Sequence, residues 1–262
     1  MAEFTSYPPG TFSWVDLATS DQTSAKTFYA DLLGWSYADM PMGDDVFYSM
    51  AQVRDKNVGA IFTMPEEQAS MGVPPHWQSY ATVESADDAA EKATGLGATI
   101  LMPPFDVFTS GRMAVIQDPG GAVFNVWQPI DHIGATLANE PGAFCWNELF
   151  TKDIDGSKAF YTGMFDWSAD TMDMGDMQYT SFKLGDRGMA GMMEINPEWG
   201  DIPPHWNIYL TVVDCDASLD KTAALGGQVL GPARDIPEVG RFGMASDPQG
   251  ATFSLIQLTN PE

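Results

Sequence analysis

The sequence repeats itself at half length, and this repeat constrains the fold more than any other feature. The hexapeptide Pro-Gly-Thr-Phe-Ser-Trp that ends at Trp14 returns as Pro-Gly-Ala-Phe-Cys-Trp at Trp146, 132 residues later, and Gly59 matches Gly191 at the same offset. Later motifs match at an offset of 129: Pro-Pro-His-Trp ending at Trp77 and Trp206, Gly-Arg at Arg112 and Arg241, and Asp-Pro beginning at Asp118 and Asp247. So many ordered matches indicate two copies of one structural unit.

The repeat predicts two homologous domains. A chain of 262 residues has room for two domains at roughly 100–200 residues each. We expect the first domain over residues 8–129 and the second over residues 141–260. Residues 130–140 are expected to form a linker, because Pro129, Gly134 and Pro141 in and beside this stretch favour turns and loops.

Each half shows the same order of helical and strand-like segments. Residues 12–18 alternate as a strand does; Asp21 is a plausible helix N-cap, and Gly34 is placed to end the helix that follows. The other segments expected in the first half are strands at 46–50, 58–64, 77–83, 99–101, 113–117 and 123–127 and a helix at 86–96. The pattern is strand-helix-strands, twice in each half, which predicts an α+β protein of four such units.

This arrangement resembles the vicinal-oxygen-chelate superfamily, the glyoxalase/bleomycin-resistance/extradiol-dioxygenase group, and most of all its duplicated actinobacterial glyoxalase-like members. The likeness rests on the segment from Asp21 to Trp35, the Asp118-Pro-Gly-Gly-Ala turn with Trp127, and their second-half counterparts. The resemblance implies four βαβββ units that form two tandem glyoxalase-like open barrels, each around a concave pocket. Function does not follow from such a fold, which hosts isomerases, dioxygenases, thiol transferases and drug-sequestering proteins.

The resemblance also places the metal ligands, which are typically two histidines and one glutamate. The first ligand lies seven residues before the aspartate that opens each unit's helix, and the carboxylate lies seven residues after the Asp-Pro turn. These positions hold Trp14, Tyr80 and Asn125 in the first half and Trp146, Tyr209 and Ser254 in the second. Indole, phenol, amide and hydroxyl groups do not make a transition-metal triad. We therefore predict no metal and no cofactor.

One carboxylate in each half is expected on the same strand face as these residues. Asp16 and Glu148 each lie two residues after the tryptophan, and side chains two apart on a strand share a face. If Trp14 faces Tyr80, Asp16 faces Gln78, and Glu148 likewise faces Asn207. Two roles remain open for the carboxylates: contact with a ligand, as tentative general bases, or pairing with buried neighbours.

Two histidines and two arginines are candidates for the pocket rim. His76 and His205 follow Pro-Pro and either cap loop backbone or act as acid/base groups near neutral pH. Arg112 and Arg241 are turn residues that could also orient an anionic ligand.

The composition of the chain limits which classes of binding partner are expected. The formal charge is −24, which disfavours nucleic acid and anionic membranes. The two cysteines provide no disulfide framework, and the N-terminus lacks the pattern of a signal peptide. We expect a cytoplasmic monomer or homodimer with a small-molecule ligand.

Three functional hypotheses follow. The first is a metal-independent protein that binds a small, largely apolar or aromatic molecule, with antibiotic sequestration as one form. The second is a glyoxalase-type lyase/isomerase or related enzyme that uses Asp16 or Glu148 as general base. In the third, one half is purely structural. The expected ligand contacts are Trp14, Gln78, Tyr80, Asn125 and Trp127 in the first half and Trp146, Asn207, Tyr209 and Ser254 in the second.

Overall fold

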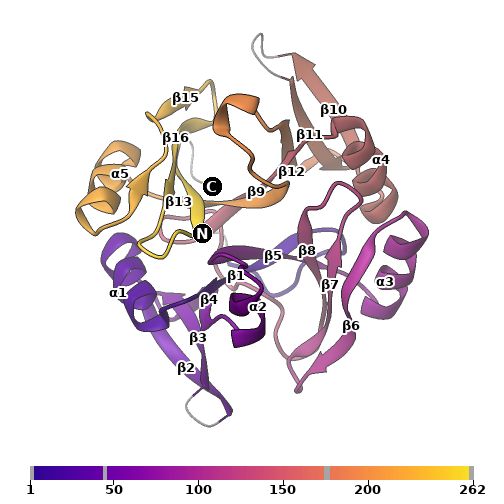
Figure 1. Cartoon of the computed structure of the whole chain (residues 1–262), viewed down its shortest axis with the longest axis horizontal. Helices are drawn as coiled ribbons and strands as arrows, with labels where there is room; N and C mark the ends of the chain where they lie inside the picture. Colours follow the sequence, from indigo (N-terminus) through magenta and orange to yellow (C-terminus); the bar gives the residue numbers. More distant parts are fainter. Residues whose placement is uncertain (1–2, 44–45, 174–177, 260–262) are drawn as a thin grey trace.

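The computed structural model describes residues 3–43, 46–173 and 178–259. Each half of the chain forms its own mixed sheet, and the four predicted βαβββ units are present (Figure 1). The first sheet has the order β2-β3-β4-β1-β5-β8-β7-β6, and the second has the order β10-β11-β12-β9-β13-β17-β16-β14, with β15 paired to β16. The predicted α+β class with four repeated units is therefore confirmed.

The first half contains β1 (Phe12–Thr19), α1 (Gln22–Leu33), β2 (Ser36–Gly43), β3 (Val46–Val53), β4 (Lys56–Thr63), α2 (Glu66–Ser70), β5 (His76–Thr82), α3 (Ala86–Gly95), β6 (Thr99–Val107), β7 (Gly111–Gln117) and β8 (Val123–Pro129). The second half contains β9 (Phe144–Thr151), α4 (Ile154–Phe165), β10 (Ser168–Asp173), β11 (Gln178–Leu184), β12 (Arg187–Glu194), the 3-10 turn η1 (Pro197–Trp199), β13 (His205–Thr211), α5 (Cys215–Ala224), β14 (Gln228–Val229), β15 (Arg234–Ile236), β16 (Gly240–Ser246) and β17 (Thr252–Leu258).

The local signals of the sequence operate as expected at the first helix. The Asp21 side chain accepts a hydrogen bond from the Ser24 amide, and Gly34 ends the helix with a φ of 75°, in the left-handed region that glycine tolerates. Strand β2 and helix α2 were not predicted. None of the residues of either element is fully buried, so no alternation of apolar and polar residues marks them.

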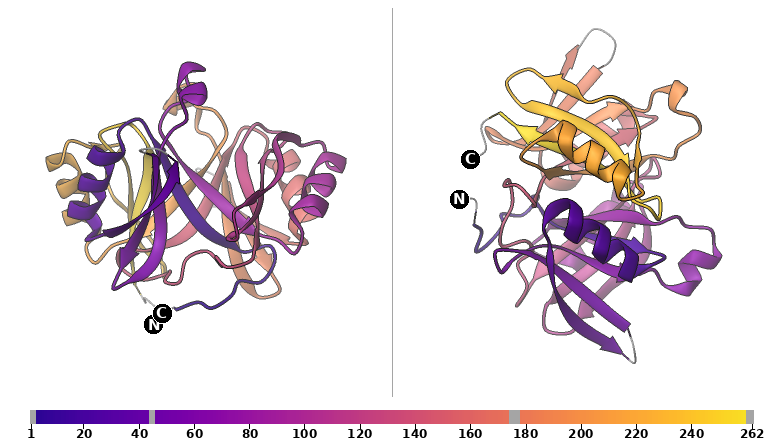
Figure 2. Two further views of the ribbon diagram at one scale, coloured as in Figure 1. Left: turned by 90° about the horizontal axis from the view of Figure 1, so that it is seen from below. Right: turned by 90° about the vertical axis from the view of Figure 1, so that its left-hand side faces the viewer.

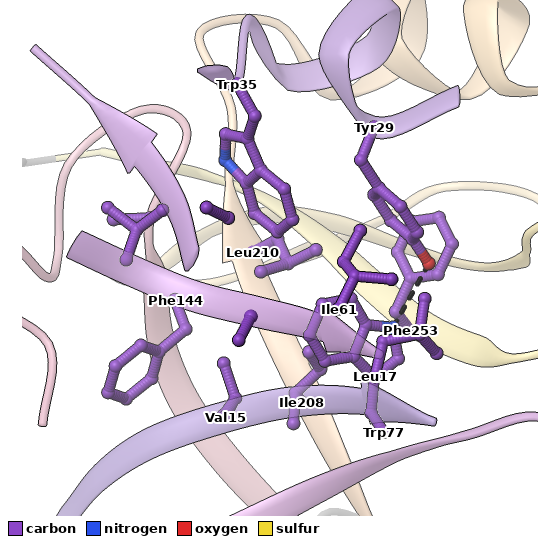
Figure 3. Packing of buried hydrophobic residues seen from close by; sticks show 14 of the residues in the cluster. Val15, Leu17, Tyr29, Trp35, Ile61, Trp77, Phe144, Ile208, Leu210 and Phe253 are labelled. Carbon is purple, nitrogen blue, oxygen red and sulfur yellow. Dashed lines mark hydrogen bonds between the residues drawn. The ribbon is translucent and has the colours of Figure 1, made fainter. Parts of the chain in front are cut away.

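Both hydrophobic cores extend across the boundary between the two halves. One core joins the first βαβββ unit to the fourth, and the other joins the second unit to the third. Helix α1 consequently lies beside α5, and α3 lies beside α4, at opposite sides of the molecule (Figures 1 and 2). In the first core, Leu17 and Ile61 of the first half pack with Leu210 and Phe253 of the second (Figure 3).

Two hydrogen-bonded relays cross between the halves. Trp77 donates to the Tyr29 hydroxyl over 3.1 Å (Figure 3), and Tyr29 donates to Asp247 of the other half over 3.2 Å. The second relay repeats the first with the halves exchanged: Trp206 donates to Tyr161, and Tyr161 donates to Asp118, each over 2.8 Å. The repeated Pro-Pro-His-Trp and Asp-Pro motifs therefore meet at the interface between the halves.

The linker packs against the first half. The Ala135 amide donates to the carbonyl of Ser13 over 2.8 Å, and the Thr136 amide donates to the carbonyl of Asn57 over 2.9 Å. These contacts place the linker across the N-terminal ends of β1 and β4. Among the helices of the described residues, none is both long and apolar enough to cross a bilayer.

Candidate functional site

The strand register brings the expected site residues together in both halves. Trp14 lies opposite Tyr80 on the antiparallel pair β1–β5, and Tyr80 lies beside Asn125 on the parallel pair β5–β8. Asp16 lies opposite Gln78, as predicted. The second half repeats this arrangement, with Trp146 opposite Tyr209, Tyr209 beside Ser254, and Glu148 opposite Asn207.

The Asp16 carboxyl is at the centre of the first arrangement and is only 1% exposed. Its Oδ2 atom accepts hydrogen bonds from the hydroxyls of Tyr48 and Tyr80, each over 2.8 Å. Tyr48 in turn accepts a 2.8 Å hydrogen bond from the Trp14 indole. The carboxyl is thus held by two phenols, one from β3 and one from β5.

Burial determines the protonation state of this carboxyl. Desolvation raises the pKa of Asp16 from 3.8 to about 7, although the bonds from Tyr48 and Tyr80 act in the opposite direction. The other oxygen, Oδ1, is buried and has no hydrogen-bond partner among the described residues. Since Oδ2 already accepts two bonds, Oδ1 is the atom that carries the proton in the neutral acid. Near neutral pH the group can donate or accept a proton there.

Glu148 has the equivalent surroundings in the second half. Its Oε2 atom accepts a 2.6 Å hydrogen bond from Tyr209, and Tyr179 also donates to this carboxyl. Tyr179 interacts with the Trp146 indole as Tyr48 does with Trp14. Desolvation by burial raises the pKa of Glu148. The indole–phenol–carboxyl chain is therefore present in both halves.

Tyr48 and Tyr179 are site residues that the sequence did not predict, because a repeat offset of 132 does not align them. Register shows that Ala60 lies beside Asp16 and that Gly191 lies beside Glu148, so the match of Gly59 to Gly191 was wrong by one residue. A one-residue change of offset, between β2 and β3, aligns the two tyrosines. An alignment that allowed this change would have found them.

The amide groups complete each interior. Asn125 donates to Gln78 over 2.9 Å, and Asn207 donates to Ser254 over 2.9 Å. The Oδ1 atoms of both asparagines are buried without a partner among the described residues. Each half therefore holds an unpartnered amide acceptor, on β8 in the first half, two strands from Asp16, and on β13 in the second, next to the strand of Glu148. A buried polar atom without a partner is unfavourable unless a water or a ligand satisfies it.

The two interiors differ at one end, where the linker closes the first. The His132 ring contacts the Trp14 ring at 4.6 Å between centroids, and the Trp127 indole donates to the His132 carbonyl over 2.8 Å. Trp14 is consequently only 3% exposed. Trp146, its counterpart, is half-buried and lines a cavity of about 860 Å³. His132 was not a predicted site residue, since it lies in the linker and has no repeat partner.

The four rim candidates have protein partners. Nδ1 of His76 lies 2.8 Å from the Pro74 carbonyl, and Nδ1 of His205 lies 2.9 Å from that of Pro203, as the backbone-capping alternative predicts. Burial lowers the pKa of both histidines. Arg112 forms ion pairs with Asp87 and Asp106, and Arg241 forms ion pairs with Asp216 and Asp235. Any anion at either arginine would compete with two carboxylates.

The groups at the family's metal positions do not fit a metal. In each half they are an indole, a phenol and an amide or hydroxyl, on neighbouring strands. Within the part of the chain that the structure describes, no three His, Cys, Asp or Glu side chains are grouped as metal ligands. The carboxyl nearest these positions is bound by tyrosine hydroxyls instead.

Two tandem mixed sheets with pseudo-equivalent interiors define a glyoxalase-like protein. The family model of the Glyoxalase/Bleomycin resistance protein/Dioxygenase superfamily matches residues 11–126 and 130–255. The chain belongs to this superfamily, as its motifs indicated.

Relatives match along almost the whole chain. The "Putative glyoxylase CFP32" of Mycobacterium tuberculosis is 44% identical over 98% of both chains. The "Anthracycline biosynthesis protein DnrV" of Streptomyces peucetius is 31% identical over 97% of this chain and 95% of its own.

Solved structures share the fold at low identity. A Mn(II)-bound glyoxalase from Novosphingobium aromaticivorans superposes with a TM-score of 0.65 at 15% identity, over 97% of this chain and 86% of its own. A variant of homoprotocatechuate 2,3-dioxygenase from B. fuscum gives 0.67 at 13% identity, over 99% and 74%. These likenesses extend to the fold alone.

Proposed function

We propose that the protein binds a small, largely apolar or aromatic molecule inside the second barrel, without a metal. The observation that carries the proposal is the contrast between the two tryptophans. The His132 ring covers Trp14, which is 3% exposed, whereas Trp146 at the equivalent place in the second half is half-buried. The first barrel is then the structural half, and the second is the working half. Sequestration of an antibiotic is one form of this function.

The second interior has the mixture of groups that small-molecule sites use. It combines the Trp146 indole with a few fixed polar groups: the Glu148 carboxyl, the hydroxyls of Tyr179 and Tyr209, and the unpartnered amide oxygen of Asn207. Ligand pockets are mostly apolar with a small number of such groups. Burial raises the pKa of Glu148, and the protonated form of this carboxyl would donate a hydrogen bond to a ligand carbonyl.

The names of two relatives support an aromatic ligand. DnrV of Streptomyces peucetius and DauV of Streptomyces sp. strain C5, 31% and 32% identical to this chain, are both named as anthracycline biosynthesis proteins. An anthracycline is a flat fused-ring molecule, and its rings would stack on an indole such as that of Trp146.

A fluorescence titration tests the proposal. Doxorubicin, as an anthracycline, and anthraquinone-2-carboxamide, as a neutral aromatic, are titrated into the protein while tryptophan emission is followed. We expect saturable quenching by at least one probe, with weaker binding in Trp146→Phe and Glu148→Gln and unchanged binding in the matched first-half variants Trp14→Phe and Asp16→Asn. Elemental analysis of protein purified without chelators should find less than stoichiometric metal. The proposal would be overturned if the first-half variants lost as much ligand affinity as the second-half variants, or if the purified protein contained stoichiometric transition metal.

A second candidate is a glyoxalase-type lyase/isomerase or related enzyme. It is favoured by the buried Glu148 carboxyl, whose pKa is raised by burial, because a general acid/base is most effective when its pKa is near the working pH. Glu148 would act in the open barrel. The hemithioacetal of methylglyoxal with a thiol is a suitable probe substrate. Turnover that Glu148→Gln abolishes would support the enzyme, and turnover that this variant leaves intact would exclude a general-base role for Glu148.

A further inference from the structure

A second, separate candidate site lies outside the barrel interiors, between the N-terminal segment and the second domain. The cavity of about 860 Å³ described above opens beside the first residues of β9 and β12. Its apolar wall is formed mainly by the aromatic side chains of Phe4, Tyr7, Phe12, Phe144 and Trp146. Its volume falls in the range of roughly 300–1,000 Å³ that small-molecule pockets occupy.

The pseudo-symmetry of the chain explains why this space is open. In the first domain the bulged residue of β1, Ser13, accepts from Ala135, and Asn57 of β4 accepts from Thr136. The linker therefore fills that position with a hydrogen-bonded peptide. The counterparts in the second domain are Cys145 and Gly188, and both line the cavity. In the second domain the same position is a pocket.

Two polar groups on the cavity wall have unused binding capacity. Arg187 is exposed and has no ion pair with a described aspartate or glutamate, although the chain carries 36 acidic residues and only 12 basic ones. Its counterpart in the first domain, Lys56, binds Glu3 over 3.0 Å, so the Glu3 carboxylate at the edge of this cavity already has a cation. The Thr11 hydroxyl is buried, lines the same cavity and has no partner among the described residues.

We infer that this cavity binds a small aromatic or amphiphilic carboxylate. The carboxylate would lie between the Arg187 guanidinium and the Thr11 hydroxyl, and the apolar part would pack on Phe4 and Trp146, the half-buried aromatic side chains of the wall. A guanidinium presents a planar fork of donors that matches a carboxylate. The strongly negative surface selects against anions elsewhere on the molecule, so an unpaired arginine in an aromatic pocket is a specific signal. The inference does not require a ligand at Glu148.

Calorimetric titration with 1-naphthoate, beside the neutral analogue 1-naphthylmethanol, tests the inference. We expect saturable 1:1 binding of naphthoate that is clearly tighter than binding of the alcohol and that weakens with added salt. Arg187→Gln should weaken naphthoate binding by roughly tenfold to a hundredfold, as expected for a hydrogen-bonded charged group, and should leave the alcohol unaffected. Thr11→Val should weaken it less.

Matched controls separate this site from nonspecific attraction of the anion and from binding inside the barrel. Arg234 is exposed, lies in the same domain and, among the described residues, forms no ion pair with a carboxylate; Arg234→Gln should leave naphthoate affinity unchanged. Glu148→Gln should also leave it unchanged, whereas a ligand of the barrel interior would respond to that variant. Unfolding curves confirm that each variant is folded. Naphthoate that fails to bind, binds no better than the alcohol, or binds Arg187→Gln as tightly as the original protein overturns the inference.

Discussion

The Tyr161 hydroxyl of the second domain donates a 2.8 Å hydrogen bond to the Asp118 carboxylate of the first, and the Trp206 indole donates to the same hydroxyl. Burial raises the pKa of Asp118, while this bond and three backbone amides lower it. We expect Tyr161→Phe to destabilise the whole chain by about 1–3 kcal/mol, because both a buried carboxylate and a buried indole lose a partner. Urea unfolding measures this effect.

Tyr29→Phe is the matched variant at the other end of the interface. Tyr29 makes the equivalent bonds to Asp247 and Trp77, although both are longer, at 3.2 and 3.1 Å. Tyr29→Phe should therefore lower the free energy of unfolding by less than Tyr161→Phe does. Since each core joins units from both halves, either variant should retain a single unfolding transition. Separate transitions for the two halves would contradict the joint stabilisation of the halves by these cores.

The raised pKa of Asp16 predicts a pH dependence of stability. In the unfolded chain the carboxyl ionises near 3.8, whereas in the folded protein it ionises near 7. The folded state therefore binds more protons between these values, and stability falls as pH rises through this window. In Asp16→Asn this contribution disappears, so the variant should gain stability relative to the original protein by up to about 4 kcal/mol between pH 4 and pH 7.

Denaturant unfolding at pH 4 and pH 8 measures this difference. Other buried carboxyls with raised pKa, such as Glu148 and Asp247, contribute equally to both proteins and cancel in the comparison. The amide that Asp16→Asn introduces keeps an oxygen to accept from Tyr48 and Tyr80. A relative stability that does not change with pH would show that Asp16 does not titrate in this range.

In each domain, the size of the buried acidic side chain is complementary to the size of the residue beside it on the neighbouring strand. The shorter carboxylate, Asp16, lies beside Ala60, and the longer one, Glu148, lies beside Gly191. A methyl group at Gly191 would come too close to the Tyr179 hydroxyl, and it would lie 3.0 Å from the Glu148 carboxyl. Gly191→Ala should therefore cost about 1–3 kcal/mol through overpacking.

Shortening the acid in the same chain tests this complementarity. The double variant Glu148→Asp with Gly191→Ala reproduces the pair found in the first domain, so it should recover part of the loss. We expect a favourable coupling of at least about 0.5 kcal/mol in a double-mutant cycle of unfolding free energies. Additive losses would mean that the two positions do not share space.

His132 closes the first barrel and should keep Trp14 away from solvent. Its ring packs edge-on against Trp14, and burial lowers its pKa to about 4. We expect His132→Ala to raise the accessibility of tryptophan to acrylamide and to shift the emission to longer wavelength. Trp14→Phe added to His132→Ala should remove this increase. Unchanged quenching in the single variant would show that the linker backbone alone closes the barrel.

The parts of the fold that the sequence predicts correctly are those with a strong local or repeated signal. Asp21 begins α1 and Gly34 ends it, as expected. The family register, with the two-residue period of strands, predicts that Trp14 faces Tyr80, and the pairing of β1 with β5 confirms this. Strand β2 escapes prediction because its residues are exposed or half-buried. Its position depends on pairing with β3, which is a tertiary contact that a local pattern does not carry.

Only some of the site residues could be predicted from the sequence, for a similar reason. The carboxyls, phenols and amides on the first strands follow from family register, whereas Tyr48 lies on another strand and reaches Asp16 through folding. The roles of Tyr29 and Asp247 depend on which halves touch, and no local pattern in the sequence signals that. The contact of His132 with Trp14 depends on the path of the linker, and the linker has no periodic pattern from which its path could be predicted.

The exchanged relays have a consequence for the origin of the chain. Each relay takes its tryptophan and tyrosine from one half and its aspartate from the other, and exchanging the halves reproduces the same contacts. A half-length ancestor with one copy of these residues would satisfy all of them by pairing with itself about a twofold axis, as isologous dimers do. The present protein has the architecture of such a homodimer fused into one polypeptide. Fusion allowed each former subunit to change alone, so the His132 ring packs on Trp14 in the first domain, whereas Trp146 in the second is half-buried.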